Sequence, residues 1–194
     1  MKRVLFLSYI VCLLVCGSFV FAELPENWTN TSFVYGHAFN RAKGAADTLG
    51  FDVSNYSFFG GTVGMFERTS LLWGLGSDDD LRLNLSLGPS LTTLIAGGAS
   101  LYAGIGPVLT LSSYQGKNYS EFQVGACLDL GIRIRFTSSP IGEMGLIGGA
   151  TGMLYFYHDL NKTPIENLSG DVQAYLGISY GRNSNLRLPY SYYL

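Results

Sequence analysis

The sequence predicts an all-β fold, an eight-stranded antiparallel up-and-down transmembrane β-barrel, and three observations support this fold class. Apolar and polar residues alternate over long stretches, which is the period of a strand with one apolar and one polar face. The longest stretch far exceeds the ~5–6 residues that are usual for a strand in a soluble domain. Only 13% of the residues are charged, against roughly 25% in ordinary soluble proteins. The apolar composition argues against a disordered chain, and a net charge of −2 without a basic run argues against nucleic-acid binding.

The N-terminal segment has the parts of a secretory signal peptide. Lys2 and Arg3 precede an apolar run over residues 4–21, and the run ends at the small residue Ala22. This pattern predicts a signal peptide over 1–22, which leaves residues 23–194 as one barrel domain. Two alternatives stay open. The run is just long enough for an uncleaved membrane anchor, and Cys16 would be the modified residue of a lipoprotein.

Four segments alternate most regularly and define the length of the strands. They cover residues 81–88, 122–136, 172–180 and 186–194. The second is 15 residues long, whereas a tilted membrane-crossing strand needs only ~9–11 residues. Together with weaker segments they predict strands at 32–42, 55–68, 81–91, 99–112, 119–136, 143–157, 170–181 and 186–194. Pro107 cannot donate to a closed ladder, so a bulge is expected there.

The charges indicate which face of these strands points outward. In the four regular segments one face carries no charge, and we expect it to contact lipid, where a charge near the midplane costs roughly 2–4 kcal/mol. The other face is expected to line the lumen with Arg82, Asp129, Arg133, Arg135 and Arg187. A soluble lipocalin-like barrel would turn the apolar face inward. Strand length, the uninterrupted apolar face and the lack of paired cysteines favour the membrane barrel.

Aromatic residues and glycines agree with a narrow membrane barrel. Inward glycines beside large tyrosines such as Tyr102, Tyr155 and Tyr175 would let side chains fill a narrow lumen. Aromatic rings at the strand ends are expected to form the girdles that lie at the two membrane interfaces. The predicted girdle residues are Phe33, Tyr35, Phe58, Phe59, Phe66, Trp73, Tyr114, Tyr119, Phe136, Tyr155, Phe156, Tyr157, Tyr190, Tyr192 and Tyr193.

In these features residues 23–194 resemble the small outer-membrane β-barrels of bacteria, similar to OmpA, OmpX and OmpW. Residues 186–194 look like the C-terminal insertion signal of such barrels, although Leu194 stands where Phe is usual. The resemblance implies location in the bacterial outer membrane, contact with its lipids, recognition by the barrel-insertion machinery and a monomeric state. It implies no cofactor. If both termini are periplasmic, the outer connections and the inner turns are about equal in length, which is unusual for such barrels. The outer connections are then 43–54, 92–98, 137–142 and 182–185, and the inner turns are 69–80, 113–118 and 158–169.

The charged face of the fifth predicted strand is the strongest candidate site. Asp129 and Arg133 lie ~13 Å apart along a strand, so each needs a partner from another strand. Candidate partners are Glu67, Arg82, Glu143 and Arg187. Two readings remain open: a charged constriction that selects a small solute, or a structural network that closes the lumen.

Other chemistry receives weaker support. Asp78, Asp79 and Asp80 could bind a divalent cation or form a solvated turn. An enzyme would need a base such as His37, which could meet Ser32 or Ser57, or His158; we expect no enzyme. The expected function is a narrow porin-like channel for small solutes or a structural membrane barrel, with an adhesin-like surface barrel and a soluble ligand-binding barrel as alternatives.

Overall fold

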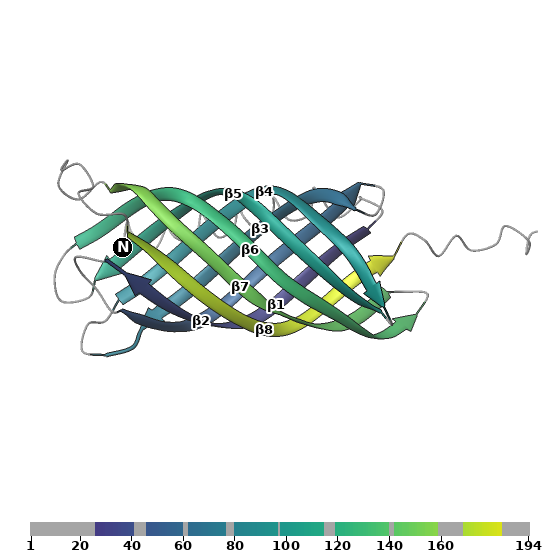
Figure 1. The fold of residues 1–194 in the computed structure, drawn as a ribbon. Helices are drawn as coiled ribbons and strands as arrows, with labels where there is room; N and C mark the ends of the chain where they lie inside the picture. Colours follow the sequence, from purple (N-terminus) through teal and green to yellow (C-terminus); the bar gives the residue numbers. More distant parts are fainter. Residues whose placement is uncertain are drawn as a thin grey trace, which may run out of the picture.

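A computed structural model describes residues 26–40, 46–59, 62–76, 80–96, 98–114, 119–139, 142–158 and 169–183. These residues form a closed barrel in which each strand pairs antiparallel with the next and β8 pairs with β1 (Figure 1). The strands are β1 (Glu26–Phe39), β2 (Asp47–Phe59), β3 (Val63–Gly74), β4 (Asp80–Ala96), β5 (Ala99–Tyr114), β6 (Tyr119–Ser139), β7 (Gly142–His158) and β8 (Ser169–Asn183). The described part of the chain contains no helix long and apolar enough to cross a membrane. The predicted eight-stranded up-and-down barrel is confirmed.

The strands are inclined to the barrel axis (Figure 1). A path along paired residues that starts at Glu26 returns to β1 at Gly36, ten residues further along, after passing Phe58, Gly64, Ser90, Gly104, Asp129, Thr151 and Gln173. Closure of a barrel couples such a stagger to a strand tilt of roughly 35–45°. The bore of an eight-stranded barrel is just wide enough for side chains to fill it.

The apolar face of the strands lies outside, as predicted. Leu176 on β8 is 66% exposed, whereas Arg133 on β6 is 3% exposed. On β2 the alternation separates Phe51, which is 48% exposed, from Asp52, which is 2% exposed. This distribution is the reverse of a soluble lipocalin-like barrel, so that alternative is wrong.

The predicted strand 55–68 is wrong, because it joins the end of β2 to the beginning of β3. The dipeptide Gly60-Gly61 is a hairpin-turn signal inside that segment. β2 therefore begins at Asp47, within a predicted connection, and β3 extends to Gly74. The barrel closes through β8, so the predicted last strand, 186–194, is not needed for closure and lies outside the described residues. The predicted number of strands was right, and six of the eight predicted segments correspond to observed strands.

With the corrected strand bounds, the connections at the two ends of the barrel are no longer equal in length. β1 begins where β8 ends, since Glu26 pairs with Asn183. At that end the strands are joined by residues 60–62, 97–98 and 140–141, and at the other end by 40–46, 75–79, 115–118 and 159–168. Short turns at the end where β1 begins and β8 ends, with longer connections opposite, are the normal arrangement of outer-membrane barrels. We call the end with the longer connections the outer end and the end with the short turns the inner end.

No bulge forms at Pro107, contrary to the prediction. The β4–β5 ladder keeps the same register on both sides of this residue, and Pro107 lies opposite Ala126 on β6. Gly88 and Gly106 face each other beside Pro107, and a Cβ on either would collide with the backbone of the other strand. The paired glycines therefore let the two strands approach closely without a bulge.

The predicted girdle residues divide between the two faces of the barrel, and those that fill the lumen cannot belong to a girdle. Exposed outward rings are Phe33, Tyr35, Phe59, Trp73, Phe136, Phe156 and Tyr157. Phe58, Phe66 and Tyr155 instead fill the lumen at 0%, 2% and 1% exposure. Successive residues of a strand point to opposite faces, so Phe58 and Phe59 cannot both contact lipid. The remaining predicted girdle residues, Tyr114, Tyr119, Tyr190, Tyr192 and Tyr193, have side chains outside the described set.

Candidate functional site

Arg68, at the centre of β3, holds the middle of the lumen together. Its Nε lies 2.5 Å from Oδ2 of Asp52 on the neighbouring strand, and its Nη1 lies 2.9 Å from Oδ1 of Asp129 on β6. Nη1 also donates to Oγ1 of Thr151 at 2.7 Å. Thr151 is on β7, four strands from β3 in either direction around the barrel. The contacts of one arginine therefore cross the full bore.

Asp129 is the acceptor on which this central cluster converges. Its carboxyl group accepts hydrogen bonds from Oγ1 of Thr151 at 2.7 Å, from the hydroxyl of Tyr175 at 3.0 Å and from the hydroxyl of Tyr56. The Arg68 guanidinium also stacks 3.9 Å from the ring centre of Tyr175. Asp129 is 0% exposed, so its charge-assisted hydrogen bonds form away from water, where they are strongest.

Glycines on neighbouring strands make room for the rings of the central cluster, as predicted. A Cβ on Gly131 would overlap the hydroxyl of Tyr102, and a Cβ on Gly149 would lie 2.5 Å from the hydroxyl of Tyr175. The two hydroxyls are 2.6 Å apart and share a hydrogen bond. Missing side chains on β6 and β7 thus admit large side chains from the neighbouring strands β5 and β8.

An aromatic layer lies on the inner side of this cluster. The ring centres of Trp28 and Phe58 are 4.8 Å apart, and those of Tyr56 and Tyr102 are 4.9 Å apart. Tyr56 also stacks on Phe66, with 5.9 Å between centres. Trp28, from β1, was not among the predicted aromatic residues, because it lies four residues N-terminal to the first residue assigned to a strand.

Charged groups flank these layers at both ends. At the outer end Nε of Arg82 pairs with Oδ2 of Asp80 at 2.8 Å, and its Nη1 lies 3.6 Å from Oδ1 of Asp171. At the inner end Nη1 of Arg133 lies 3.3 Å from one oxygen of Glu143, and Nη1 of Arg135 lies 2.7 Å from the other. Arg133 also covers the ring of Trp28 at 4.6 Å. The described lumen therefore holds ion pairs at both ends, with the aromatic layer and the central cluster between them.

The structure places four of the five predicted lumen residues on the inner face of the barrel. Arg82, Asp129 and Arg133 are buried in the lumen, at 1%, 0% and 3% exposure. Arg135 also faces inward, with 37% of its side chain exposed, whereas Arg187 lies outside the described residues. Glu143 is a partner of β6, as expected.

Two other expected partners of β6 were wrong. Glu67 faces outward, and Arg82 pairs with Asp80 and Asp171 instead.

Sequence reasoning missed Asp52, Arg68 and Asp171. The merged strand 55–68 left Asp52 in a supposed loop and Arg68 at a supposed strand end. The alternation Phe51, Asp52, Val53 around an inward acid was the signal that could have located it. Asp171 lies at the start of predicted strand 170–181 and was not singled out.

The described candidates for metal and catalytic chemistry do not assemble, and Asp78 and Asp79 lie outside the described residues. Asp80 points into the lumen at 2% exposure and pairs with Arg82 rather than forming a solvated turn. Within the described ranges no group of three or more His, Cys, Asp or Glu side chains is placed to hold a metal ion. His37 faces Asp47, with 2.8 Å between Nδ1 and Oδ1, and does not meet Ser32 or Ser57. The side chain of His158 lies outside the described set.

Comparison with known proteins gives the context of this barrel. No protein-family model matches the chain, and no curated protein sequence is significantly similar to it. Among solved structures, Neisserial surface protein A superposes with a TM-score of 0.60 at 10% identity, covering 81% of this chain and 96% of that one. This chain has the fold of the small bacterial outer-membrane β-barrels.

Two further barrels of this kind match over similar lengths. Ail, the attachment invasion locus protein of Yersinia pestis, gives a TM-score of 0.53 at 14% identity and covers 82% of this chain and 99% of that one. The outer membrane protein OprG from Pseudomonas aeruginosa gives 0.51 at 13% identity, with 82% and 97% covered. The resemblance to small outer-membrane barrels is confirmed at the level of the fold.

Proposed function

We propose that this chain is a non-enzymatic structural barrel of the outer membrane whose lumen is closed to solutes. The observation that carries the proposal is the set of Arg68 contacts, because they join β2, β3, β6 and β7 across the bore with donors and acceptors that are almost fully buried. A conducting pore needs a continuous polar path, whereas these layers alternate ion pairs with packed rings.

The network also gives the barrel a physical means of holding its shape. A closed sheet fixes neighbouring strands to one another, but only contacts across the bore fix opposite walls. Arg68 and Asp129 provide such contacts near mid-height, and Arg133 on β6 provides one near the inner end by covering the ring of Trp28 on β1. We propose that stiffness of this kind suits a membrane anchor or scaffold.

A solute channel is the second candidate, because the charged groups at both ends resemble a constriction. It requires the central cluster to open, with Arg68 leaving Asp129 and Thr151 together. The attachment role named for Ail concerns that protein, and at 14% identity it supports a surface role here only as a further alternative.

Single-channel recording in planar bilayers tests the proposal. We expect no conductance steps from the wild type or from Arg133→Ala, which removes contacts at the inner end and leaves the central cluster in place. A triple variant, Tyr56→Ala with Arg68→Ala and Tyr102→Ala, removes the central cluster and its rings and should conduct, which shows that inserted protein is present. Regular steps from the wild type that change in size with Arg133→Ala would establish the channel instead.

A further inference from the structure

The outer face of β1–β3 differs from the rest of the outer surface. Elsewhere the outward positions of the strands are apolar along most of their length, as with Leu128, Leu130, Ile132 and Ile134 on β6. On β1–β3 the outward positions carry a patch of polar side chains: Thr29, Thr31, Asn55, Ser57, Glu67 and Thr69. We call these residues the outer polar patch.

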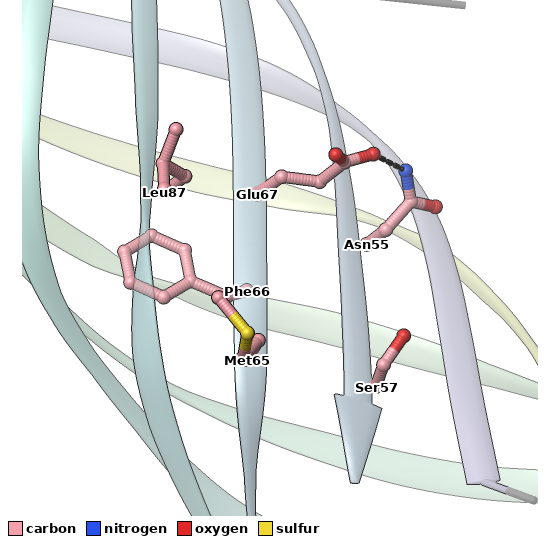
Figure 2. A pocket seen from close by; sticks show the side chains of 6 residues that line it. All are labelled: Asn55, Ser57, Met65, Phe66, Glu67 and Leu87. Atoms are coloured by element: carbon pink, nitrogen blue, oxygen red, sulfur yellow. Dashed lines mark hydrogen bonds between the residues drawn. The ribbon is translucent and has the colours of Figure 1, made fainter. Parts of the chain in front are cut away.

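Three members of the patch form a hydrogen-bonded row across the strands. Oγ1 of Thr29 donates to Oδ1 of Asn55 at 2.8 Å, and Nδ2 of Asn55 donates to Oε1 of Glu67 at 2.6 Å. The same residues are register partners, Thr29 with Asn55 and Asn55 with Glu67. Figure 2 shows the amide of Asn55 turned toward the carboxyl group of Glu67.

The row lies within the apolar belt rather than at its edge. Along β3, Glu67 is preceded on the same face by Val63 and Met65, which are 54% and 36% exposed, and is followed by Trp73 at 45%. Along β2, Asn55 lies between Val53 at 46% and Phe59 at 51%. Hydrocarbon offers no hydrogen bonds, so polar groups at this depth have to be satisfied by protein.

The row leaves one hydrogen-bond acceptor and one donor unused, and these two groups are complementary to each other. A carboxyl group has two oxygens, and a primary amide has two N–H groups. The second oxygen of Glu67 and the second N–H of Asn55 have no partner within the part of the chain that the structure describes. An acceptor and a donor in adjacent positions are complementary to the same pair after a twofold rotation.

The surface beside the row can pack against the outer face of a second barrel. A groove of about 160 Å³ is lined by Asn55, Ser57, Met65, Phe66, Glu67 and Leu87 (Figure 2). Short side chains such as Thr29, Thr31 and Thr69 allow close approach, which favours association within membranes. An apolar side chain from an opposing barrel would enter the groove while the polar groups pair beside it.

We infer that the outer polar patch is the interface of a homodimer in the membrane, formed with a second copy of this chain. Both copies keep the same orientation in one membrane, so the twofold axis runs along the membrane normal and passes between β2 and β3. Glu67 of each copy then accepts a hydrogen bond from Asn55 of the other. This replaces the monomer expected from the resemblance.

The dimer is tested by the oligomeric state in lipid vesicles, measured by single-molecule photobleaching over a series of protein-to-lipid ratios. We expect a wild-type dimer fraction that rises with protein density. Glu67→Leu and Asn55→Leu should each lower the association constant roughly tenfold by removing both symmetric hydrogen bonds. Glu67→Gln keeps a carbonyl acceptor and should retain most of the dimer. Leu130→Ala, on β6, is the matched outward control and should leave the association unchanged.

Cross-linking gives a second readout that does not depend on a stability change. In a Cys127→Ser background, Asn55→Cys and Glu67→Cys chains carrying different tags should form a mixed disulfide dimer, whereas Leu130→Cys chains should not. Heat-modifiable migration on gels checks that each variant is folded. A wild type that stays monomeric at every density, dimers that persist equally in Glu67→Leu, or cross-links only to another protein would overturn the inference.

Discussion

Replacing Arg68 with methionine tests whether the middle of the lumen is dry and closed. Methionine has a side chain of similar reach but carries no charge and no donor. In the variant the carboxyl groups of Asp52 and Asp129, which are 2% and 0% exposed, lose the guanidinium that lies 2.5 Å and 2.9 Å away. Removing one partner of a buried ion pair costs ~3–5 kcal/mol, and we expect the free energy of unfolding to fall by that amount.

The measurement is reversible urea unfolding in detergent micelles or vesicles, followed by the fluorescence of Trp28 in the lumen and Trp73 on the outer face. Arg135→Met is the matched control. Its side chain is 37% exposed and shares Glu143 with Arg133, so the loss should stay within ~1 kcal/mol. Adding Asp52→Asn and Asp129→Asn to Arg68→Met removes the stranded carboxyl groups and should recover most of the stability.

If Arg68→Met lowered the free energy of unfolding as little as Arg135→Met does, this reasoning would be refuted. That result would mean that water reaches Asp52 and Asp129 in the native barrel, because only solvation can replace the lost guanidinium at no cost. A water-filled centre would also remove the main support for the closed lumen.

Three further predictions follow from the same geometry. Leu176→Arg places a charge on the lipid face of β8 and should lower the free energy of unfolding in vesicles by ~2–4 kcal/mol, whereas Leu176→Ala should change it far less. Gly131→Ala drives a Cβ into the hydroxyl of Tyr102 and should cost ~1–3 kcal/mol in urea unfolding, against no significant cost for Gly152→Ala, where nothing lies within 4 Å. A chain truncated before residue 186 keeps all eight described strands and should refold in detergent with unchanged stability. Its yield in the outer-membrane fraction of cells should fall if the insertion machinery recognises 186–194, and an unchanged yield would exclude that role.

The faces of the strands could be predicted from the sequence because the strand period of two is local. Once Leu176 was assigned to lipid, the residues Gln173, Tyr175 and Ser179 had to point inward, and they do. The same parity located Arg82, Asp129 and Arg133 in the lumen. Long regular segments such as 122–136 were recognised for this reason.

The partners across the bore could not be predicted in the same way. Arg68 and Asp129 are 61 residues apart, and they meet only because the closed register brings β3 and β6 to the same height. That register depends on where each hairpin turns, so overlooking the turn signal at Gly60-Gly61 displaced everything near it. Because this one turn was overlooked, neither Arg68 nor Asp52 was recognised as a lumen residue.

The adjacent charges Glu67 and Arg68 explain why this barrel has polar groups on both of its faces. Neighbouring residues of a strand point to opposite sides, so the lumen can take only one of the two. It takes Arg68, which gains two carboxyl partners and a threonine across the bore. Glu67 is then forced onto the lipid face, where Asn55 satisfies one of its oxygens and Thr29 orients that amide. If Glu67 had no role on the lipid face, Glu67→Leu would stabilise the barrel and change nothing else. Loss of association between barrels in the same variant would show that the outward carboxyl group serves the dimer.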